Sequence, residues 1–154
     1  MSAKELILRP ASLEDSAALL HIEQAACALP WSAGHFRSIL QDTSNTYITQ
    51  ILLEDNTPIA YFIGMLGVEE SHLLNIAVHP KHQGKGYARL LLEHLKTWSL
   101  AGGAHAIWLE VRESNTRAYQ LYRQQGFVDV ALRKNYYPTA EGGREHARIL
   151  RLDL

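Results

Sequence analysis

The chain has 154 residues, of which 47% are hydrophobic, enough to build one compact domain with a buried core. Its 15 Lys and Arg residues nearly balance its 16 Asp and Glu residues, so no overall basic field attracts nucleic acid or anionic lipid. No apolar run approaches the roughly 20 residues needed to span a bilayer, and the segment 1–5 lacks a signal-peptide pattern. These features predict a cytoplasmic protein with a single domain over residues 1–154 and no nucleic-acid or membrane partner.

The first half of the chain predicts strands and helices in alternation. Ser12, followed three residues later by Asp15, is typical of a helix start, and Ser32 predicts a second start after the break at Pro30. The turn residues Glu54-Asp55-Asn56-Thr57 separate two apolar runs and favour an antiparallel hairpin. The predicted elements are a strand at 6–9, helices at 13–27 and 33–41, and strands at 46–53 and 58–65.

The second half predicts a crossover unit in which a helix connects two parallel strands. Ala88, Leu91, Leu92 and Leu95 follow helical spacing, and Gly102-Gly103 ends that helix. Such units place ligands at the carboxyl ends of their strands. The predicted elements are a strand at 71–78, a helix at 84–101, a strand at 106–111, a helix at 115–125, and strands at 128–132 and 144–152. A long loop at 135–143 is predicted to form a substrate wall.

The junction between strand 71–78 and the following helix contains Gly84-Lys85-Gly86. The first amides of a helix lack intrahelical partners and carry partial positive charge, so glycines there can admit a phosphate group. An ordinary strand-to-helix turn is the alternative. Arg89 occupies the position of the third glycine in a dinucleotide-binding motif, and no nucleoside-triphosphatase phosphate loop is present.

The segment Gln83-Gly84-Lys85-Gly86-Tyr87-Ala88 resembles the acetyl-CoA signature of the GNAT family of N-acetyltransferases, Gln/Arg-x-x-Gly-x-Gly/Ala after a strand. The segments "HPKHQGKGYARLLLEHL" and "NTRAYQLYRQQGF" are also typical of this family, and the resemblance covers residues 5–152. Within the family, "LLNIAVHP", "WLEVRESNTRAYQLYRQQGF" and "RKNYYP" resemble the bacterial RimI branch, the ribosomal-protein-alanine N-acetyltransferases.

The resemblance implies an α/β fold with a mixed, mostly antiparallel sheet, a central splayed parallel strand pair and flanking helices. It also implies acetyl-CoA as co-substrate and no metal. The acyl arm is expected in the gap between the splayed strands, where it would bind the backbone of strand 71–78 and contact Asn115. The pyrophosphate is expected on the loop that follows this strand. The residues implied for acetyl-CoA are Ile76, Ala77, Val78, Gly84, Lys85, Gly86, Tyr87, Ala88, Arg89 and Asn115. Asn115 also suits ordinary helix initiation.

Acetyl transfer to an amine requires a base and an acid. Glu110 lies in an otherwise apolar strand, and apolar surroundings would raise its pKa toward the useful range, whereas a salt bridge or an exposed edge is the alternative. The resemblance to RimI-like enzymes implies that this Glu is the base. The match to the family's acid implies that Tyr122 is the acid, although Tyr122 could instead be core packing. Direct attack of the amine on acetyl-CoA is favoured over a covalent acyl-enzyme, because no nucleophile motif is present.

The resemblance further implies that the acceptor is the α-amine of an N-terminal alanine, as on ribosomal protein eighteen of the small subunit. Glu23, Trp31, Tyr136 and Tyr137 are predicted to line the acceptor side, with a solvated helix face as the alternative for Glu23. An acetyltransferase for lysine or small amines, and a non-catalytic acetyl-CoA sensor, remain as other interpretations. The eight histidines form no metal-binding motif.

Overall fold

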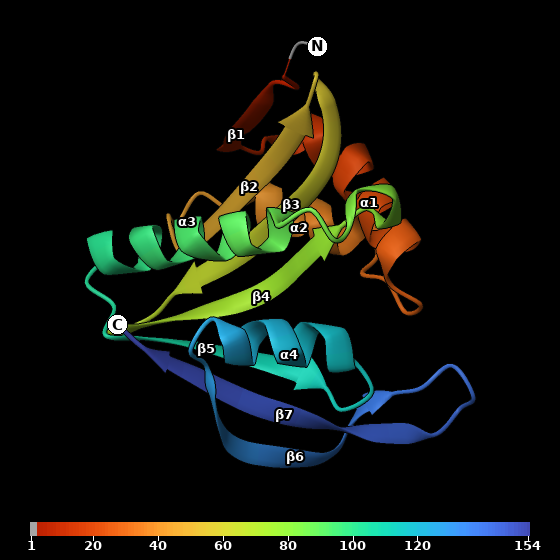
Figure 1. Cartoon of the computed structure of the whole chain (residues 1–154), viewed down its shortest axis with the longest axis vertical. Helices are drawn as coiled ribbons and strands as arrows, with labels where there is room; N and C mark the ends of the chain where they lie inside the picture. The colour runs from red at the N-terminus through yellow and green to blue at the C-terminus, as the bar shows by residue number, and fades with distance from the viewer. Residues whose placement is uncertain (1–2) are drawn as a thin grey trace. The chain divides into compact units, whose positions relative to one another are not determined.

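The computed structural model describes residues 3–154, so Met1 and Ser2, the start of the segment examined for a signal peptide, lie outside it. In chain order the elements are β1 (Leu6–Pro10), η1 (Leu13–Asp15), α1 (Ser16–Ala26), α2 (Ala33–Gln41), β2 (Tyr47–Glu54), β3 (Thr57–Leu66), β4 (Glu70–Val78), η2 (Pro80–His82), α3 (Tyr87–Ala101), β5 (Ala106–Arg112), α4 (Thr116–Gln124), β6 (Val128–Pro138) and β7 (Arg144–Asp153) (Figure 1).

The strands of the described residues form a seven-stranded sheet in the order β1-β2-β3-β4-β5-β7-β6. The pairs β1–β2, β2–β3, β5–β7 and β6–β7 are antiparallel. The pair β4–β5 is parallel, as the strand–helix–strand pattern predicts. The predicted fold class, a mixed and mostly antiparallel sheet with a central parallel pair and flanking helices, is confirmed.

The described residues divide into two compact units by their contacts. The first contains the residues up to Met65 together with Asn75–Leu91, and the second contains Leu66–Leu74 together with Leu92–Leu154. Strand β4 and helix α3 each contribute residues to both units.

Turn and capping residues define the elements of the first unit. Asp55 and Asn56 join β2 to β3 with φ of 48° and 68°, a left-handed conformation that Asp and Asn tolerate well. The amide of Ser12 donates to the Asp15 carboxylate at 2.8 Å, a capping interaction at the predicted helix start. The helix predicted from residue 13 consists of the short η1 followed by α1, and the Ser32 hydroxyl accepts from the His35 amide to start α2.

The core of the first unit covers both faces of β3. Tyr61 and Phe62 are both fully buried, although consecutive strand residues point to opposite faces of a sheet. Phe36 of α2 packs edge-on against Tyr61, with ring centroids 5.7 Å apart. Helix α2 therefore packs on the Tyr61 face of the strand.

The second unit is built on strands β4, β5, β7 and β6. Residues Glu70–Leu73 pair in parallel with Ala106–Leu109, and β5 pairs antiparallel with β7 from Ala106↔Asp153 to Arg112↔Ala147. Leu109 and Val111 are buried on one face of β5, whereas Glu110 points to the opposite face and is exposed. This alternation is the ordinary one of a strand, in which successive side chains point to opposite faces.

Helix α3 ends where the sequence predicts. Gly103 has φ of 85°, and the Gly102 amide still donates to the Trp98 carbonyl at 3.0 Å, which closes the last turn. None of the helices within residues 3–154 is both long and apolar enough to cross a membrane.

The prediction of a long loop at 135–143 is wrong, because β6 continues to Pro138. Tyr137 pairs with Glu145 and Pro138 pairs with Arg144, which leaves only residues 139–143 as the connection to β7. An irregularity lies between Arg133 and Tyr137, where Asn135 has φ of 52°. The segment Asn-Tyr-Tyr-Pro contains turn-forming residues, but pairing with β7 holds it in the sheet.

Candidate active site

The junction between β4 and α3 presents backbone N–H groups that have no acceptor within residues 3–154. Helix α3 begins at Tyr87, three residues later than predicted, and Gly84 and Gly86 have φ of 80° and 84°. Among the described residues, none accepts a hydrogen bond from the amides of Gly84 to Arg89. An ideal Cβ placed on Gly86 would meet no atom within 4 Å. The junction therefore offers converging donors and open space, which suits a phosphate group.

The Gln83 side chain stabilises the start of this junction. Its Nε2 donates to the Val78 carbonyl at 2.9 Å, which ties the junction to the end of β4. Ala77 and Val78 are buried and Ile76 is half-buried. Binding of an acyl arm to the backbone of these three residues stays a prediction.

Glu54 holds the first residue of α3. The Tyr87 hydroxyl donates to the Glu54 carboxylate, the Lys4 Nζ lies 3.1 Å from Glu54 Oε1, and the His82 Nδ1 lies 3.7 Å from the same oxygen. These bonds, Tyr87 first and then Lys4, lower the pKa of Glu54. The Tyr87 amide has no acceptor among the described residues and is available to a ligand. Sequence analysis missed Glu54, which it assigned to a polar turn.

Glu23 is a buried acceptor, so the alternative of a solvated helix face is wrong. It is 3% exposed and accepts from the Trp31 amide at 3.0 Å, the Tyr61 hydroxyl at 3.1 Å and Asn75 Nδ2 at 3.0 Å. Burial and the Glu23 charge raise the pKa of Tyr61, which keeps that phenol protonated. Asn75 interrupts an apolar strand in the sequence, a signal that could have revealed this network.

The Glu23 network also sets the conformation after α1. The bond from the Trp31 amide holds the segment between α1 and α2, and the Trp31 ring stacks on His35 with centroids 3.8 Å apart. Two residues predicted for the acceptor side, Glu23 and Trp31, are thus in direct contact. Their binding of an acceptor stays a prediction.

In the second unit, the surroundings of Glu110 are polar, which corrects the expectation of an apolar environment. Its side chain is 32% exposed, and its Oε1 accepts from Arg133 Nη1 at 2.9 Å. The salt-bridge alternative is therefore what the structure shows, with Arg133 as the partner. An ion pair does not exclude proton transfer, and the role of Glu110 as base stays a prediction.

Tyr122 combines a buried ring with an unengaged hydroxyl. The residue is 6% exposed and its ring packs edge-on against Phe127 with centroids 5.8 Å apart. Its hydroxyl forms no hydrogen bond with any other described residue. Burial raises the pKa of Tyr122, so the phenol holds its proton throughout the neutral range. The Tyr122 ring packs in the core while its hydroxyl remains free to donate a proton. A role in core packing and a role as catalytic acid are therefore compatible.

Tyr136 and Tyr137 lie on β6 rather than in a loop. Their rings contact edge-on with centroids 4.9 Å apart, and Arg112 lies over the Tyr137 ring at 4.4 Å. Burial, followed by the charge of Glu110, raises the pKa of Tyr137 to about 12. The second unit therefore brings both tyrosines and Glu110 together.

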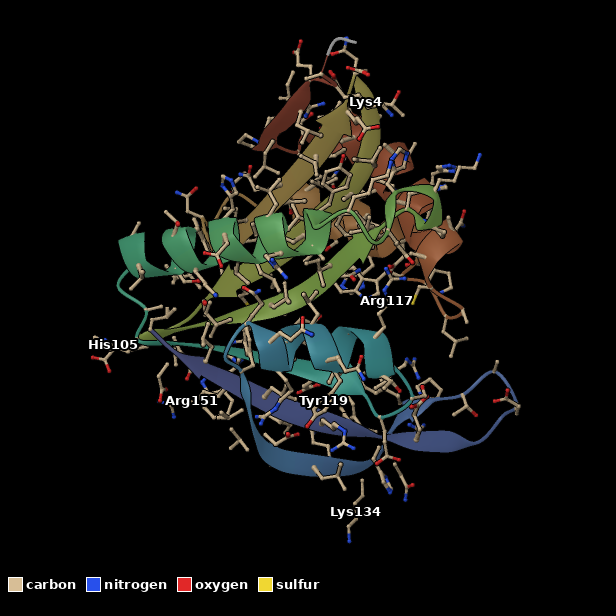
Figure 2. All side chains as sticks on the ribbon, viewed as in Figure 1. Lys4, His105, Arg117, Tyr119, Lys134 and Arg151 are labelled. Atoms are coloured by element: carbon tan, nitrogen blue, oxygen red, sulfur yellow. The ribbon has the colours of Figure 1, made fainter. Side chains whose placement is uncertain are left out.

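Asn115 caps α4. Its Oδ1 accepts from the Ala118 amide at 3.3 Å, the ordinary helix-start role that the sequence left open. The Nδ2 hydrogens of Asn115 could still donate to acetyl-CoA, and this contact stays a prediction. Figure 2 shows the labelled Arg117 and Tyr119 on the same helix. Within residues 3–154, no group of three or more His, Cys, Asp or Glu side chains is arranged to hold a metal ion.

The glycine-bearing junction follows strand β4, whose pair with β5 is parallel, and its amides suit a phosphate-bearing co-substrate. The acetyltransferase (GNAT) family model matches residues 16–127, and the chain belongs to this family. It is an N-acetyltransferase, as curated relatives of high identity also indicate.

Its similarity is to one branch of that family. The ribosomal protein bS18-alanine N-acetyltransferase of Haemophilus ducreyi is 41% identical over 92% of this chain and 95% of that protein. The enzyme of the same name from Escherichia coli K12 is 41% identical over 91% of this chain and 92% of that protein. The crystal structure of the ribosomal-protein-S18-alanine N-acetyltransferase from Escherichia coli covers 97% of this chain and 94% of its own, with a TM-score of 0.88 and 38% identity. The predicted resemblance to the RimI branch is confirmed.

More distant structures share only the fold with this chain. Arabidopsis thaliana NAA60 in complex with acetyl-CoA has a TM-score of 0.85 and 13% identity, and the match covers 97% of this chain and 99% of that one.

Proposed function

We propose that this protein transfers the acetyl group of acetyl-CoA to the α-amine of an N-terminal alanine, with ribosomal protein bS18 as its substrate. The similarity to two bS18-alanine N-acetyltransferases at 41% identity over nearly the full length of each carries the proposal. The family match at residues 16–127 includes parts of both units, and we propose a single acetyltransferase domain over residues 1–154.

The free amides of the β4–α3 junction would bind the pyrophosphate of acetyl-CoA. Gly84 and Gly86 allow close approach, and the exposed side chains of Lys85 and Arg89 add positive charge at the start of α3. The acyl arm would follow the backbone of Ile76–Val78, with Asn115 as a further contact. An amide of that strand would stabilise the oxyanion that develops on the thioester carbonyl.

Gly86→Glu should weaken acetyl-CoA binding by about 100-fold or more, because a carboxylate would then occupy the position of phosphate. Gly103→Glu is the matched control: Gly103 has φ of 85° and Gly86 of 84°, and neither has an atom within 4 Å of an added Cβ. Both variants therefore carry the same backbone strain at a positive φ. Titration calorimetry with acetyl-CoA measures the difference, and equal affinity in the two folded variants would reject the phosphate site.

In the proposed reaction, Glu110 takes a proton from the substrate ammonium, directly or through water, and the free amine attacks the thioester carbonyl. The C–N bond forms and the C–S bond breaks, and Tyr122 gives its proton to the departing thiolate. The amide nitrogen then loses its extra proton, which passes through solvent and restores the Tyr122 phenol. Burial raises the pKa of Tyr122, so the phenol enters the reaction with its proton in place. No covalent acyl-enzyme is required.

An α-amine is the acceptor that suits this base. Its pKa of about 8 lies roughly two units below that of a lysine side chain, so a carboxylate deprotonates it more readily. Glu23, Trp31, Tyr136 and Tyr137 are proposed to line the acceptor side. The buried Glu23 network would keep the segment around Trp31 in one conformation for the incoming peptide.

A peptide panel tests this function. The protein should acetylate the amino terminus of a peptide that begins with alanine, and mass spectrometry locates the added group. The same peptide with a blocked amino terminus and an internal lysine should remain unmodified. Preferential lysine modification would reject the α-amine assignment, and no transfer to any amine would favour an acetyl-CoA sensor.

A further inference from the structure

Arg133 of β6 contacts the proposed base across an intervening strand. In the sheet order β5-β7-β6, Arg133 and Arg112 both lie opposite Ala147 of β7, on the face that also carries Glu110. The small, fully buried Ala147 lets the long Arg133 side chain cross β7 to reach Glu110 Oε1 at 2.9 Å.

The contacts of Arg133 and Arg112 differ. Arg112 donates to the Pro138 carbonyl at 2.7 Å, pairs with Glu145 at 3.4 Å and covers the Tyr137 ring, so its contacts hold β6 and β7 together. Arg133 pairs with Glu110 and lies over the Tyr136 ring at 4.1 Å, with its side chain 49% exposed. Ion pairs with both partners this exposed contribute little to folding stability. The main effect of the Arg133–Glu110 pair is therefore to restrain the Glu110 carboxylate.

The pair leaves one carboxylate oxygen available. Arg133 binds Glu110 Oε1, and no described residue donates a hydrogen bond to Oε2. The Arg133 guanidinium also lies over the Tyr136 ring, and this cation–π contact further restrains it. Arg133 thus restrains the carboxylate while Oε2 can still accept a proton.

We propose that Arg133 is a positioning residue for acetyl transfer, which holds Oε1 of Glu110 so that Oε2 faces the amine. This inference rests on the proposed role of Glu110 as base. A misplaced base lowers the rate of the chemical step and leaves binding of the donor unchanged. Arg133 therefore affects kcat and not the affinity for acetyl-CoA.

Steady-state kinetics with acetyl-CoA and the alanine peptide test the role of Arg133. Arg133→Gln should lower kcat roughly 10-fold with little change in KM for acetyl-CoA, because the carboxylate loses its orientation. Arg133→Lys should recover part of the loss, since an ammonium can still pair with Oε1. Lys134→Gln removes the same charge from the next residue, which points away from the sheet in Figure 2, and should keep wild-type kinetics.

A double-mutant cycle with Glu110→Gln separates this inference from the proposed function. If Arg133 acts through Glu110, Arg133→Gln should have no further effect in the Glu110→Gln background. A similar loss in both backgrounds, or wild-type kcat in Arg133→Gln while Glu110→Gln is impaired, would overturn the positioning role alone. Full activity of Glu110→Gln would overturn the proposed base, and the role of Arg133 with it.

Discussion

Replacing Tyr122 by Phe should lower kcat/KM for acetyl transfer by about 100-fold or more, while acetyl-CoA binding stays nearly unchanged. The substitution removes one oxygen and keeps the ring that packs against Phe127. Because the Tyr122 hydroxyl has no partner within residues 3–154, its removal leaves no buried group unsatisfied. The melting temperature should therefore barely change, and stopped assays of peptide acetylation measure the rate.

Tyr119→Phe is the matched control for this experiment. Tyr119 lies on the same helix, labelled in Figure 2, and its hydroxyl donates to Asp129. Removing that hydroxyl should leave turnover intact. Wild-type turnover in Tyr122→Phe would return Tyr122 to a role in core packing.

Replacing Glu110 by Gln should also lower kcat/KM by about 100-fold or more near neutral pH, because an amide cannot accept the proton of the substrate amine. The shape of the side chain is retained, and the Gln oxygen can still accept from Arg133. Since Glu110 is exposed, the change should have little effect on stability. Acetyl-CoA affinity, measured by calorimetry, should match that of the wild type.

Glu113→Gln provides the comparison for charge alone, because Glu113 is exposed and lies three residues further along the chain. It should retain full activity. If the Glu110→Gln variant turns over the alanine peptide as fast as this control, another group must deprotonate the amine.

The amino-acid sequence determined the elements and the chemistry that depend on local pattern. The positions of Ser12, Ser32 and Gly103 were predicted as helix starts and ends, because capping depends on residues within one turn. The parallel pair β4–β5 followed from the strand–helix–strand order. The glycine-bearing junction at Gly84 and Gly86 was recognisable because positive φ and close approach favour one residue type.

Only the tertiary structure decided which side chains meet. Glu23 contacts Tyr61 and Asn75, which lie 38 and 52 residues away along the chain, so no local pattern could distinguish a buried acceptor from a solvated one. Glu110 meets Arg133 because β7 lies between their strands with a small Ala at the crossing point. The segment from Asn135 to Pro138 is a strand because β7 pairs with it. Long-range pairing sets burial and charge at these positions, and sequence spacing carries no information about either.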